Sequence, residues 1–392
     1  MADDRRFTRD TLTVAIGGTA GAIPDDRLVS RDRLNAAFGV TVGPIPDDRY
    51  ATRDMLTALL AAQVPDPEPE PEPEPVVTPI VLGDPFTVTE ETTGAGGTQA
   101  QAAGYSMPTQ VLAGTSPFYV PNGETIENRI INGRVIMQGT SSLINCIVRG
   151  TVTAPTGEIP LVLTSSATMA TIRYVTVQPQ TPSSFWSGIG NSNYTAEYCK
   201  VLDCTDSFRA SKAGLAKVLA VGCFSADMVQ FRPDQAINRA ETHNDIVQLG
   251  GNTGDVNDVV YDTCWFDARH NRTKSTQPYN NTRYANPGNL TGNYVNLAVF
   301  MCVPAQSPKI SATFKRSVLL GGIATINMAS RNPGGQIVVA DCLMEKPADV
   351  TPGNAWPIWN GGGLNTLEVT NTRYINAAKT AATATPIVVY NG

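Results

Sequence analysis

The stretch RIINGRVIMQGTSSLINCIVRG, residues 129–150, holds short apolar runs that are interrupted by glycines and polar residues. Runs of the same kind recur along the chain: ATIRYVTVQ (170–178), AEYCKVLDC (196–204), AKVLAVGCF (216–224), DVVYDTCWF (258–266), FKRSVLLGG (314–322), QIVVADCLM (336–344) and LEVTNTRYI (367–375). Few windows show the 3.6-residue period of a helix. Short runs rich in Val, Ile, Thr and Tyr predict β-strands.

The spacing of these runs predicts how the strands are arranged. Equivalent points fall at Cys146, Tyr174, Cys199, Cys223, Cys264, Val318, Cys342 and Arg373. The steps up to Cys223, and the step from Val318 to Cys342, are nearly equal, whereas the others are longer. A base period of about 24 residues with insertions predicts a β-solenoid, whose stacked coils bury one continuous inner column. The alternative is a β-sandwich, but that fold places turn signals every 8–12 residues.

The seven cysteines are an odd number, are widely spread and include no CxxC pair. This pattern argues against a zinc module or a disulfide framework. We expect small buried thiols. Those that recur at equivalent points should form a ladder inside the solenoid.

Residues 1–63 contain one unit repeated three times at even spacing, starting at Asp3, Asp25 and Asp47. Each unit has Thr or Ser before Arg-Asp and then an apolar pattern, which predicts a short helix with a hydroxyl N-cap. The shared polar residues suit capping and surface pairing. We therefore assign residues 1–63 to attachment or assembly.

Residues 64–79 form a Pro/Glu-rich linker containing PDPEPEPEPEP. Alternating Pro and acid favours an extended polyproline II spacer, and these residues span about 34 Å. The predicted domains are thus the repeats of 1–63, this linker, and a β-solenoid over 80–392.

Charge and hydropathy exclude two classes of partner. The net charge is −6, but residues 1–78 hold 14 of the 35 acidic and 8 of the 29 basic side chains, so the remaining chain is neutral. A neutral body lacks the basic footprint of a nucleic-acid binder. No apolar run in the sequence is long enough for a membrane-spanning helix, which takes about 20 residues. The charged start MADDRRFTRD is not a secretory signal, so we expect synthesis in the cytoplasm and exit by lysis or within a particle.

Four stretches carry a resemblance to a known family: YVPNGETIENRIINGRVIMQGTSSLINCIVRG (119–150), SGIGNSNYTAEYCKV (187–201), DSFRAS (206–211) and HNDIVQ (243–248). They resemble a right-handed parallel β-helix family, similar to pectate lyases, of actinobacteria and their phages. The resemblance covers roughly residues 104–346. Ser207 and Ile246 stand where that family has glycine, which permits close approach of a ligand to the backbone.

Phage members of this family are minor tail proteins. The resemblance therefore implies a virion fibre or spike component that recognises a host cell-surface polysaccharide, and it leaves open whether the protein also degrades that polysaccharide. Its partners would be that glycan and, through residues 1–63, other tail proteins; a homotrimer is compatible with such a role. The alternatives are a cellular polysaccharide lyase or glycoside hydrolase, and a purely structural fibre component.

The resemblance and the residue chemistry together suggest a site. The candidate catalytic residues are His243, Asp245, Asp206 and Arg209. The candidate ligand-binding residues are Gln248, Trp186, Arg232, Asp262, Asp267 and His270. A hydrolase would use two carboxylates, one of them as the acid. A lyase would use a base such as His243 or Arg209, with Ca²⁺ as its one possible cofactor.

A scaffold interpretation of HNDIVQ stays open. In a straight strand His243 and Asp245 share one face and Gln248 lies on the other. All three can be exposed together only if the strand bends near Asp245. Otherwise Asp245 caps a turn, His243 packs at a corner and Gln248 pairs in a ladder. The polar insertion 269–294 is long enough to form a wall of a groove.

Overall fold

The computed structural model describes residues 79–153, 159–164, 168–191, 193–210, 216–231, 242–250, 256–268, 297–303, 309–322, 324–328, 335–346, 356–360 and 366–391. The chain divides into two units, Met1–Val76 and Val77–Gly392. The predicted helical repeats and nearly all of the Pro/Glu linker lie outside the described residues. The fold below is that of the second unit.

Three parallel sheets make up this unit. Sheet C consists of β2 Thr125–Glu127, β5 Ser142–Ile144, β8 Ala170–Arg173, β11 Tyr194–Glu197, β14 Ala216–Val221, β17 Val256–Asp262, β20 Ile310–Lys315, β23 Gln336–Ala340 and β26 Thr366–Thr370. Sheet A consists of β3 Ile130–Ile131, β6 Ile147–Val148, β9 Thr176–Val177, β12 Lys200–Leu202, β15 Phe224–Ala226, β18 Trp265–Asp267, β21 Val318–Leu320, β24 Leu343–Met344, β27 Arg373–Ile375 and β28 Ala382–Pro386. Sheet B consists of β1 Phe118–Val120, β4 Val135–Met137, β7 Ile159–Thr164, β10 Trp186–Gly190, β13 Phe208–Ala210, β16 Asn244–Gly250, β19 Leu297–Val303, β22 Ala324–Asn327, β25 Trp356–Asn360 and β29 Val389–Asn391.

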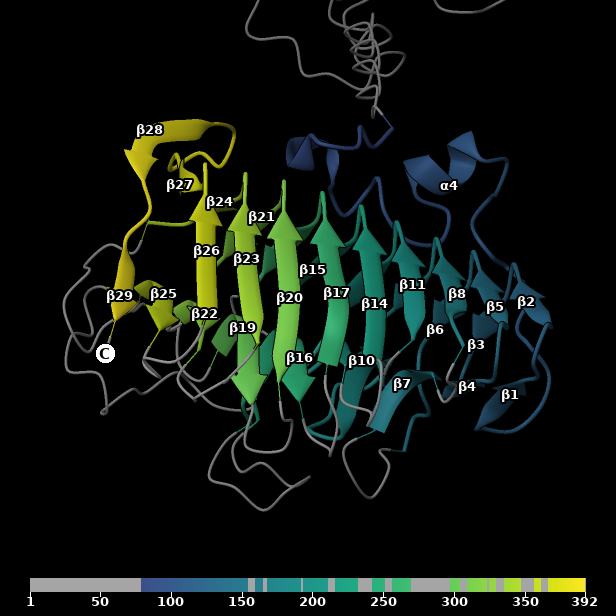
Figure 1. Cartoon of the computed structure of the whole chain (residues 1–392). Helices are drawn as coiled ribbons and strands as arrows, with labels where there is room; N and C mark the ends of the chain where they lie inside the picture. Colours follow the sequence, from purple (N-terminus) through teal and green to yellow (C-terminus); the bar gives the residue numbers. More distant parts are fainter. Residues whose placement is uncertain are drawn as a thin grey trace, which may run out of the picture. The chain divides into compact units, whose positions relative to one another are not determined.

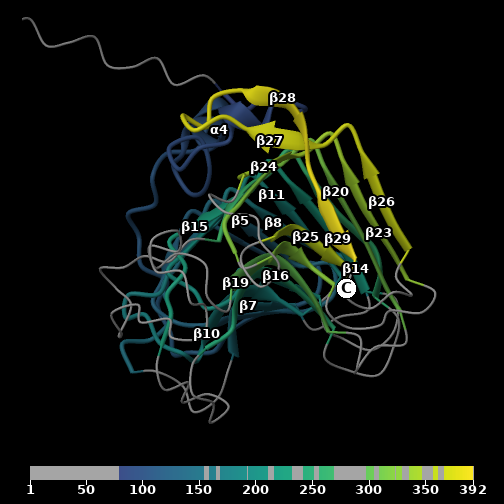
Figure 2. The same cartoon turned by 90° about the vertical axis from the view of Figure 1, so that its left-hand side faces the viewer.

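The chain visits the three sheets in the order C, A, B and then repeats, so each coil adds one strand to every sheet, and the last coil adds β28 to sheet A as well. Coil 1 is β2–β3–β4 and each later coil takes the next three strands, so coil 4 is β11–β12–β13. Figure 1 shows the strands of sheet C side by side along the axis, and Figure 2 looks along that axis at the three sheets. The two views give a right-handed winding. Among the described strands every pairing except β27 with β28 is parallel, which a β-sandwich does not allow. The predicted right-handed parallel β-helix is confirmed.

The turn from sheet C to sheet A has the same form in every coil. One residue there takes a positive φ between 46° and 61°: Asn128, Asn145, Tyr174, Tyr198, Gly222, Thr263, Arg316, Asp341 and Asn371. This left-handed conformation turns the backbone sharply, and Asn, Asp and Gly tolerate it best. The rest of the coil can therefore vary in length while the corner stays constant.

From coil 2 onward, the residue after each of these corners points into the core. From coil 2 onward the inward positions are Cys146, Val175, Cys199, Cys223, Cys264, Ser317, Cys342 and Thr372, all buried. The predicted cysteine ladder is thus confirmed, although the sequence alignment was one residue off at Tyr174, Val318 and Arg373. The thiols bond to backbone oxygens; Cys199 Sγ lies 3.4 Å from the carbonyl of Ile172 in the preceding coil.

Residues 79–104, named the strap here, precede the coils and lie along the C-to-A corners. The strap contains η1 Pro85–Thr87 and α4 Thr98–Ala102, seen in blue in Figure 1. Its backbone amides bond to one coil after another. Gly83 N donates to Thr263 Oγ1 in coil 6 (2.9 Å), and Gly94 N donates to the Tyr198 carbonyl in coil 4 (2.8 Å). The strap therefore runs opposite to the direction in which the coils later wind.

The strap continues over the earlier coils in the same way. Ala95 N donates to Thr176 Oγ1 (3.0 Å) in coil 3, and Gly96 N donates to Asn145 Oδ1 (2.9 Å) in coil 2. Gly94 has a φ of +78°, and a Cβ there would lie 2.3 Å from Thr176 Oγ1. Glycine is therefore required at this close approach. Sequence reasoning did not identify this segment.

Candidate functional site

The connection from sheet A to sheet B varies most between coils. In coil 4 it comprises only residues 203–207, between β12 and β13. The same connection comprises residues 178–185 in coil 3, between β9 and β10, and residues 227–243 in coil 5, between β15 and β16. Residues 203–207 are all buried, and only Cys204 among them is not polar. Buried polar groups demand hydrogen bonds, so this short connection must be held by its neighbours.

Asp206 is the centre of that hydrogen bonding. Asp206 is 2% exposed, and its side chain accepts a hydrogen bond through Oδ1 from the backbone N of Asp245 in the next coil (3.0 Å). The Asp245 carbonyl accepts from Ser207 N in return (3.1 Å). The carbonyl of Asp206 accepts from Gly188 N in the preceding coil (2.7 Å). Asp206 thus ties coils 3, 4 and 5 together.

Arg209 places a positive charge beside this carboxylate. Arg209 Nη1 lies 4.0 Å from Asp206 Oδ2, and its side chain is 19% exposed. At this distance the two groups attract each other, and the Arg209 side chain stays partly exposed. Arg209 connects the buried carboxylate to the outer surface of sheet B.

Gln248 lies next to Arg209 on that outer surface. The register of β13 and β16 pairs Arg209 with Gln248, whereas the flanking Phe208 and Val247 pair with each other in the core. Side chains alternate across a strand, so Arg209 and Gln248 both point outward. Gln248 Oε1 is buried and has no hydrogen-bond partner among the described residues. Such an acceptor is costly unless water or a ligand bonds to it.

The three polar residues of HNDIVQ are not equally exposed. His243 is exposed just before β16, Asp245 is 1% exposed and Gln248 is half-buried. Alternation fails at the start of β16, because residues 244–247 are all buried. Asn244 Nδ2 donates to the Val229 carbonyl (2.7 Å), so Val229, near the start of the coil 5 connection, lies against this end of the strand. The motif therefore contributes both scaffold and surface groups.

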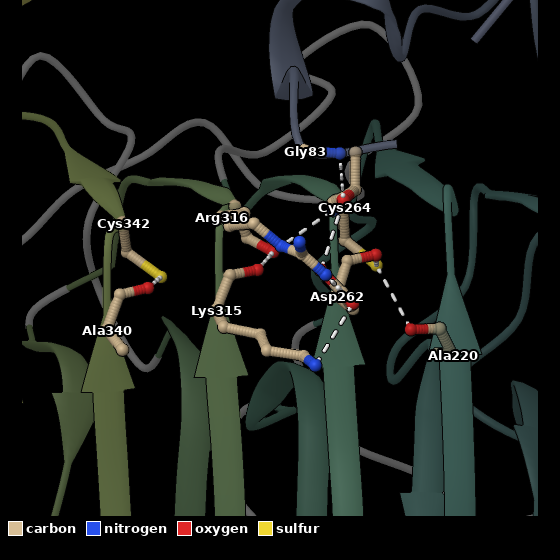
Figure 3. A network of polar contacts seen from close by, with 10 residues as sticks. Gly83, Ala220, Asp262, Cys264, Lys315, Arg316, Ala340 and Cys342 are labelled. Atoms are coloured by element: carbon tan, nitrogen blue, oxygen red, sulfur yellow. Dashed lines mark hydrogen bonds and ion pairs between the residues drawn. The ribbon is translucent and has the colours of Figure 1, made fainter. Parts of the chain in front are cut away.

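Asp262 lies in a different sheet from Asp206. It ends β17 in sheet C, where Lys315 Nζ (3.2 Å) and the Arg316 guanidinium bind its carboxylate (Figure 3). Burial alone would raise the pKa of Asp262, but the hydrogen bonds from Arg316, Lys315 and Thr263 together lower it. The described structure does not bring this carboxylate to Asp206.

The other candidate ligand residues are also dispersed. Trp186 begins β10 with 2% exposure and packs in the hydrophobic core, so its ring offers almost no surface to a ligand. Asp267 is half-buried at the end of β18 in sheet A. Arg232 and His270 lie outside the described residues, and so does the insertion 269–294. The residues brought together are therefore Asp206, Arg209, Asp245 and Gln248, with His243 at the edge.

Sequence reasoning missed Asn327 and Trp359, which continue the outer row of sheet B beyond Gln248. The sequence marks these two residues by their place in the same register two or more coils later. Finding them would have required accurate coil boundaries. In the described part of the chain, no three His, Cys, Asp or Glu side chains form a group that could hold a metal ion. No described helix is long and apolar enough to cross a membrane.

Comparison with known proteins adds little. No protein-family model matches the chain, and no curated protein matches it. Among solved structures, the chain is similar to the A-module of a mannuronan C-5 epimerase from Azotobacter vinelandii, with 12% identity and a TM-score of 0.18. The match covers 79% of this chain and 96% of that chain. A TM-score this low carries no argument, so the fold assignment rests on the strand pairing described above.

Proposed function

We propose that the chain is a phage tail fibre or spike component that binds a host cell-surface polysaccharide through coils 4 and 5. The family resemblance of residues 119–150 and 243–248 and the repeated N-terminal units support the tail assignment. The binding assignment rests on one observation: Arg209 and Gln248 stand side by side on the outer face of sheet B, and Gln248 Oε1 has no described partner.

This pair suits the chemistry of a sugar. Sugar hydroxyls both donate and accept hydrogen bonds, and Arg209 supplies N–H donors where Gln248 supplies an amide donor and acceptor. The exposed imidazole of His243 lies near the start of the same strand. Each such bond contributes about 0.5–1.5 kcal/mol, and more when one partner is charged.

We propose binding rather than cleavage as the primary activity. A glycoside hydrolase needs two carboxylates that flank the scissile bond. Asp206 and Asp245 are close in the fold but only 2% and 1% exposed, and Asp206 already accepts a hydrogen bond from the Asp245 backbone. The Ser207 side chain lies in the interior of the β-helix, where its Oγ accepts a hydrogen bond from Ser225 Oγ (2.7 Å). Hydrolysis and lyase activity stay predictions.

The test uses the full chain and polysaccharides extracted from actinobacterial cell walls. We expect Gln248→Ala to weaken binding of the retained polysaccharide about three- to thirty-fold, because it removes one or two hydrogen bonds. The melting curve should stay near that of the wild type, since Gln248 packs at the surface. Lys217→Ala, which removes an exposed ion pair with Asp258 on sheet C, is the matched control. Equal binding by both variants, or a lowered melting temperature with normal binding by Gln248→Ala, contradicts the proposal.

The same mixtures report on cleavage. New reducing ends would indicate cleavage by either class, because hydrolysis and elimination both create them; unsaturated sugar products would indicate a lyase, and their absence a hydrolase. Loss of either product in Asp206→Asn, with binding retained, would extend the proposed function to catalysis.

A further inference from the structure

The outer row of sheet B does not end at Gln248. Strand register pairs Arg209 with Gln248, Gln248 with Met301, Met301 with Asn327, and Asn327 with Trp359. These five positions, named the sheet B row here, belong to five consecutive strands, β13, β16, β19, β22 and β25. They form one line parallel to the axis of the β-helix.

The residues beside this row establish which way it faces. Phe208, Val247, Ile326 and Ile358 each precede a row position and are fully buried in the core. Because side chains alternate across a strand, the residues that follow these four, namely Arg209, Gln248, Asn327 and Trp359, face outward. Arg209, Gln248, Asn327 and Trp359 are all half-buried, as expected for side chains that lie against the outside of a sheet.

The chemistry of the row changes at coil 4. In coils 1 to 3 the equivalent outward positions are occupied by Ile136, Leu163 and Gly190, and Tyr119 precedes them on β1. None of these carries a charge or an amide. From coil 4 onward the row presents a guanidinium, two carboxamides and an indole. The change coincides with Asp206, so the polar part of the row starts at the proposed binding site.

Neighbouring strands in a sheet are about 4.8 Å apart, so the four steps from Arg209 to Trp359 span about 19 Å. A ligand that contacts the whole row must be several pyranose rings long. A chain that crossed the row at right angles would contact one coil only. The amides of Gln248 and Asn327 suit hydroxyls along such a chain, and the indole of Trp359 suits the apolar face of a ring.

We infer that the ligand is an internal segment of a long polysaccharide, lying parallel to the β-helix axis along the sheet B row, with Asn327 and Trp359 as binding residues remote from Arg209 and Gln248. This inference rests on the proposed function and adds the size and direction of its ligand. It separates a polymer binder from a protein that recognises one sugar or a chain end.

The experiment compares ligands of different length on the full chain. The polysaccharide retained above is used intact and after partial acid hydrolysis, with the fragments sorted by size. Affinity should rise from disaccharide to hexasaccharide. Trp359→Ala should weaken binding of the intact polymer about two- to twelve-fold, the loss of one aromatic contact, and leave disaccharide binding unchanged. Gln248→Ala should weaken both.

Tyr119→Ala is the control, because Tyr119 is an exposed aromatic on the same outer face of sheet B at the other end. It should bind every ligand as the wild type does. If Trp359→Ala does not fold, Asn327→Ala replaces it with the same expectation. Affinity that is independent of ligand length, or unchanged polymer binding by Trp359→Ala while Gln248→Ala is impaired, overturns the inference and leaves the proposed function standing. Unchanged polymer binding by Gln248→Ala overturns the proposed function itself.

Discussion

Replacing Gly94 by alanine tests whether the strap is pressed against the coils. Gly94 has a φ of +78°, and an added Cβ would lie 2.3 Å from Thr176 Oγ1 and 3.0 Å from Lys200 Cβ. The matched control is Gly104→Ala, also in the strap. Gly104 has a φ of +89°, but nothing lies within 4 Å of its added Cβ. The two variants share the backbone penalty and differ in the clash.

The structure gives the size of each effect. Positive φ costs an alanine about 1–2 kcal/mol, and the stiffer unfolded chain returns about 0.4–1 kcal/mol. Gly104→Ala should therefore lower the free energy of unfolding by at most about 1.6 kcal/mol. Gly94→Ala adds overpacking of about 1–3 kcal/mol. If Thr176 rotates away, its bond from Ala95 N is also lost, worth about 0.5–1.5 kcal/mol.

The assay is denaturant unfolding of the full chain, followed by circular dichroism and by tryptophan fluorescence. Limited proteolysis of the native protein reports separately on cutting within residues 79–104. We expect Gly94→Ala to unfold at lower denaturant than Gly104→Ala and to be cut faster in the strap. Equal unfolding midpoints and equal cutting rates for the two variants would refute the close approach.

Asp262→Asn should destabilise the protein at pH 7, because the fold lowers the pKa of Asp262 and the ionised carboxylate therefore stabilises the native state. This stabilisation is lost as the pH falls through the native pKa, so the difference in unfolding free energy from the wild type should shrink. Denaturant unfolding at pH 7 and pH 3 measures the difference, and a constant value contradicts the prediction. Burial raises the pKa of Cys146 to about 11 and that of Cys342 to about 12, so thiol reagents at pH 8 should label these two residues only after unfolding, as mass spectrometry would report; rapid labelling of the native protein would exclude their ladder positions. If residues 1–63 attach the chain to a phage tail, as proposed above, deleting them should abolish incorporation into particles and leave the proposed polysaccharide binding intact; loss of binding with normal incorporation would reverse the assignment.

The coils could be predicted from sequence because one corner recurs in each of them. A cysteine follows that corner at Cys146, Cys199 and Cys223, and these cysteines mark the inward position one or two coil periods apart. The prediction slipped by one residue at Tyr174 and Val318, since neither corner there carries a cysteine to mark it. A valine or serine at the inward position resembles the residues around it, so the sequence does not show which of them points into the core.

The site was harder to predict than the coils. Asp206 and Asp245 were correctly placed in adjacent coils, because each falls on one sequence motif. Their burial was not predicted, since it depends on hydrogen bonds between coils that no local pattern reveals. Asp262 was grouped with them because it falls in the next coil, yet one coil contains three sheets and Asp262 ends a strand of another sheet. Trp186 was expected at the surface for its residue type, but its ring packs in the core.

The strap also sets an order of events during synthesis. Gly83 bonds to Thr263, which lies 180 residues later in the chain. At a translation rate of about 5–20 residues per second, the ribosome needs about 9–36 s to make that partner after Gly83 emerges. In that time coils 1 to 5 can wind, whereas the hydroxyl to which Gly83 N bonds has not yet been made. The segment made first in this unit is therefore among the last to dock, and a ribosome stalled before Thr263 should hold a nascent chain in which Gly83 is still open to protease.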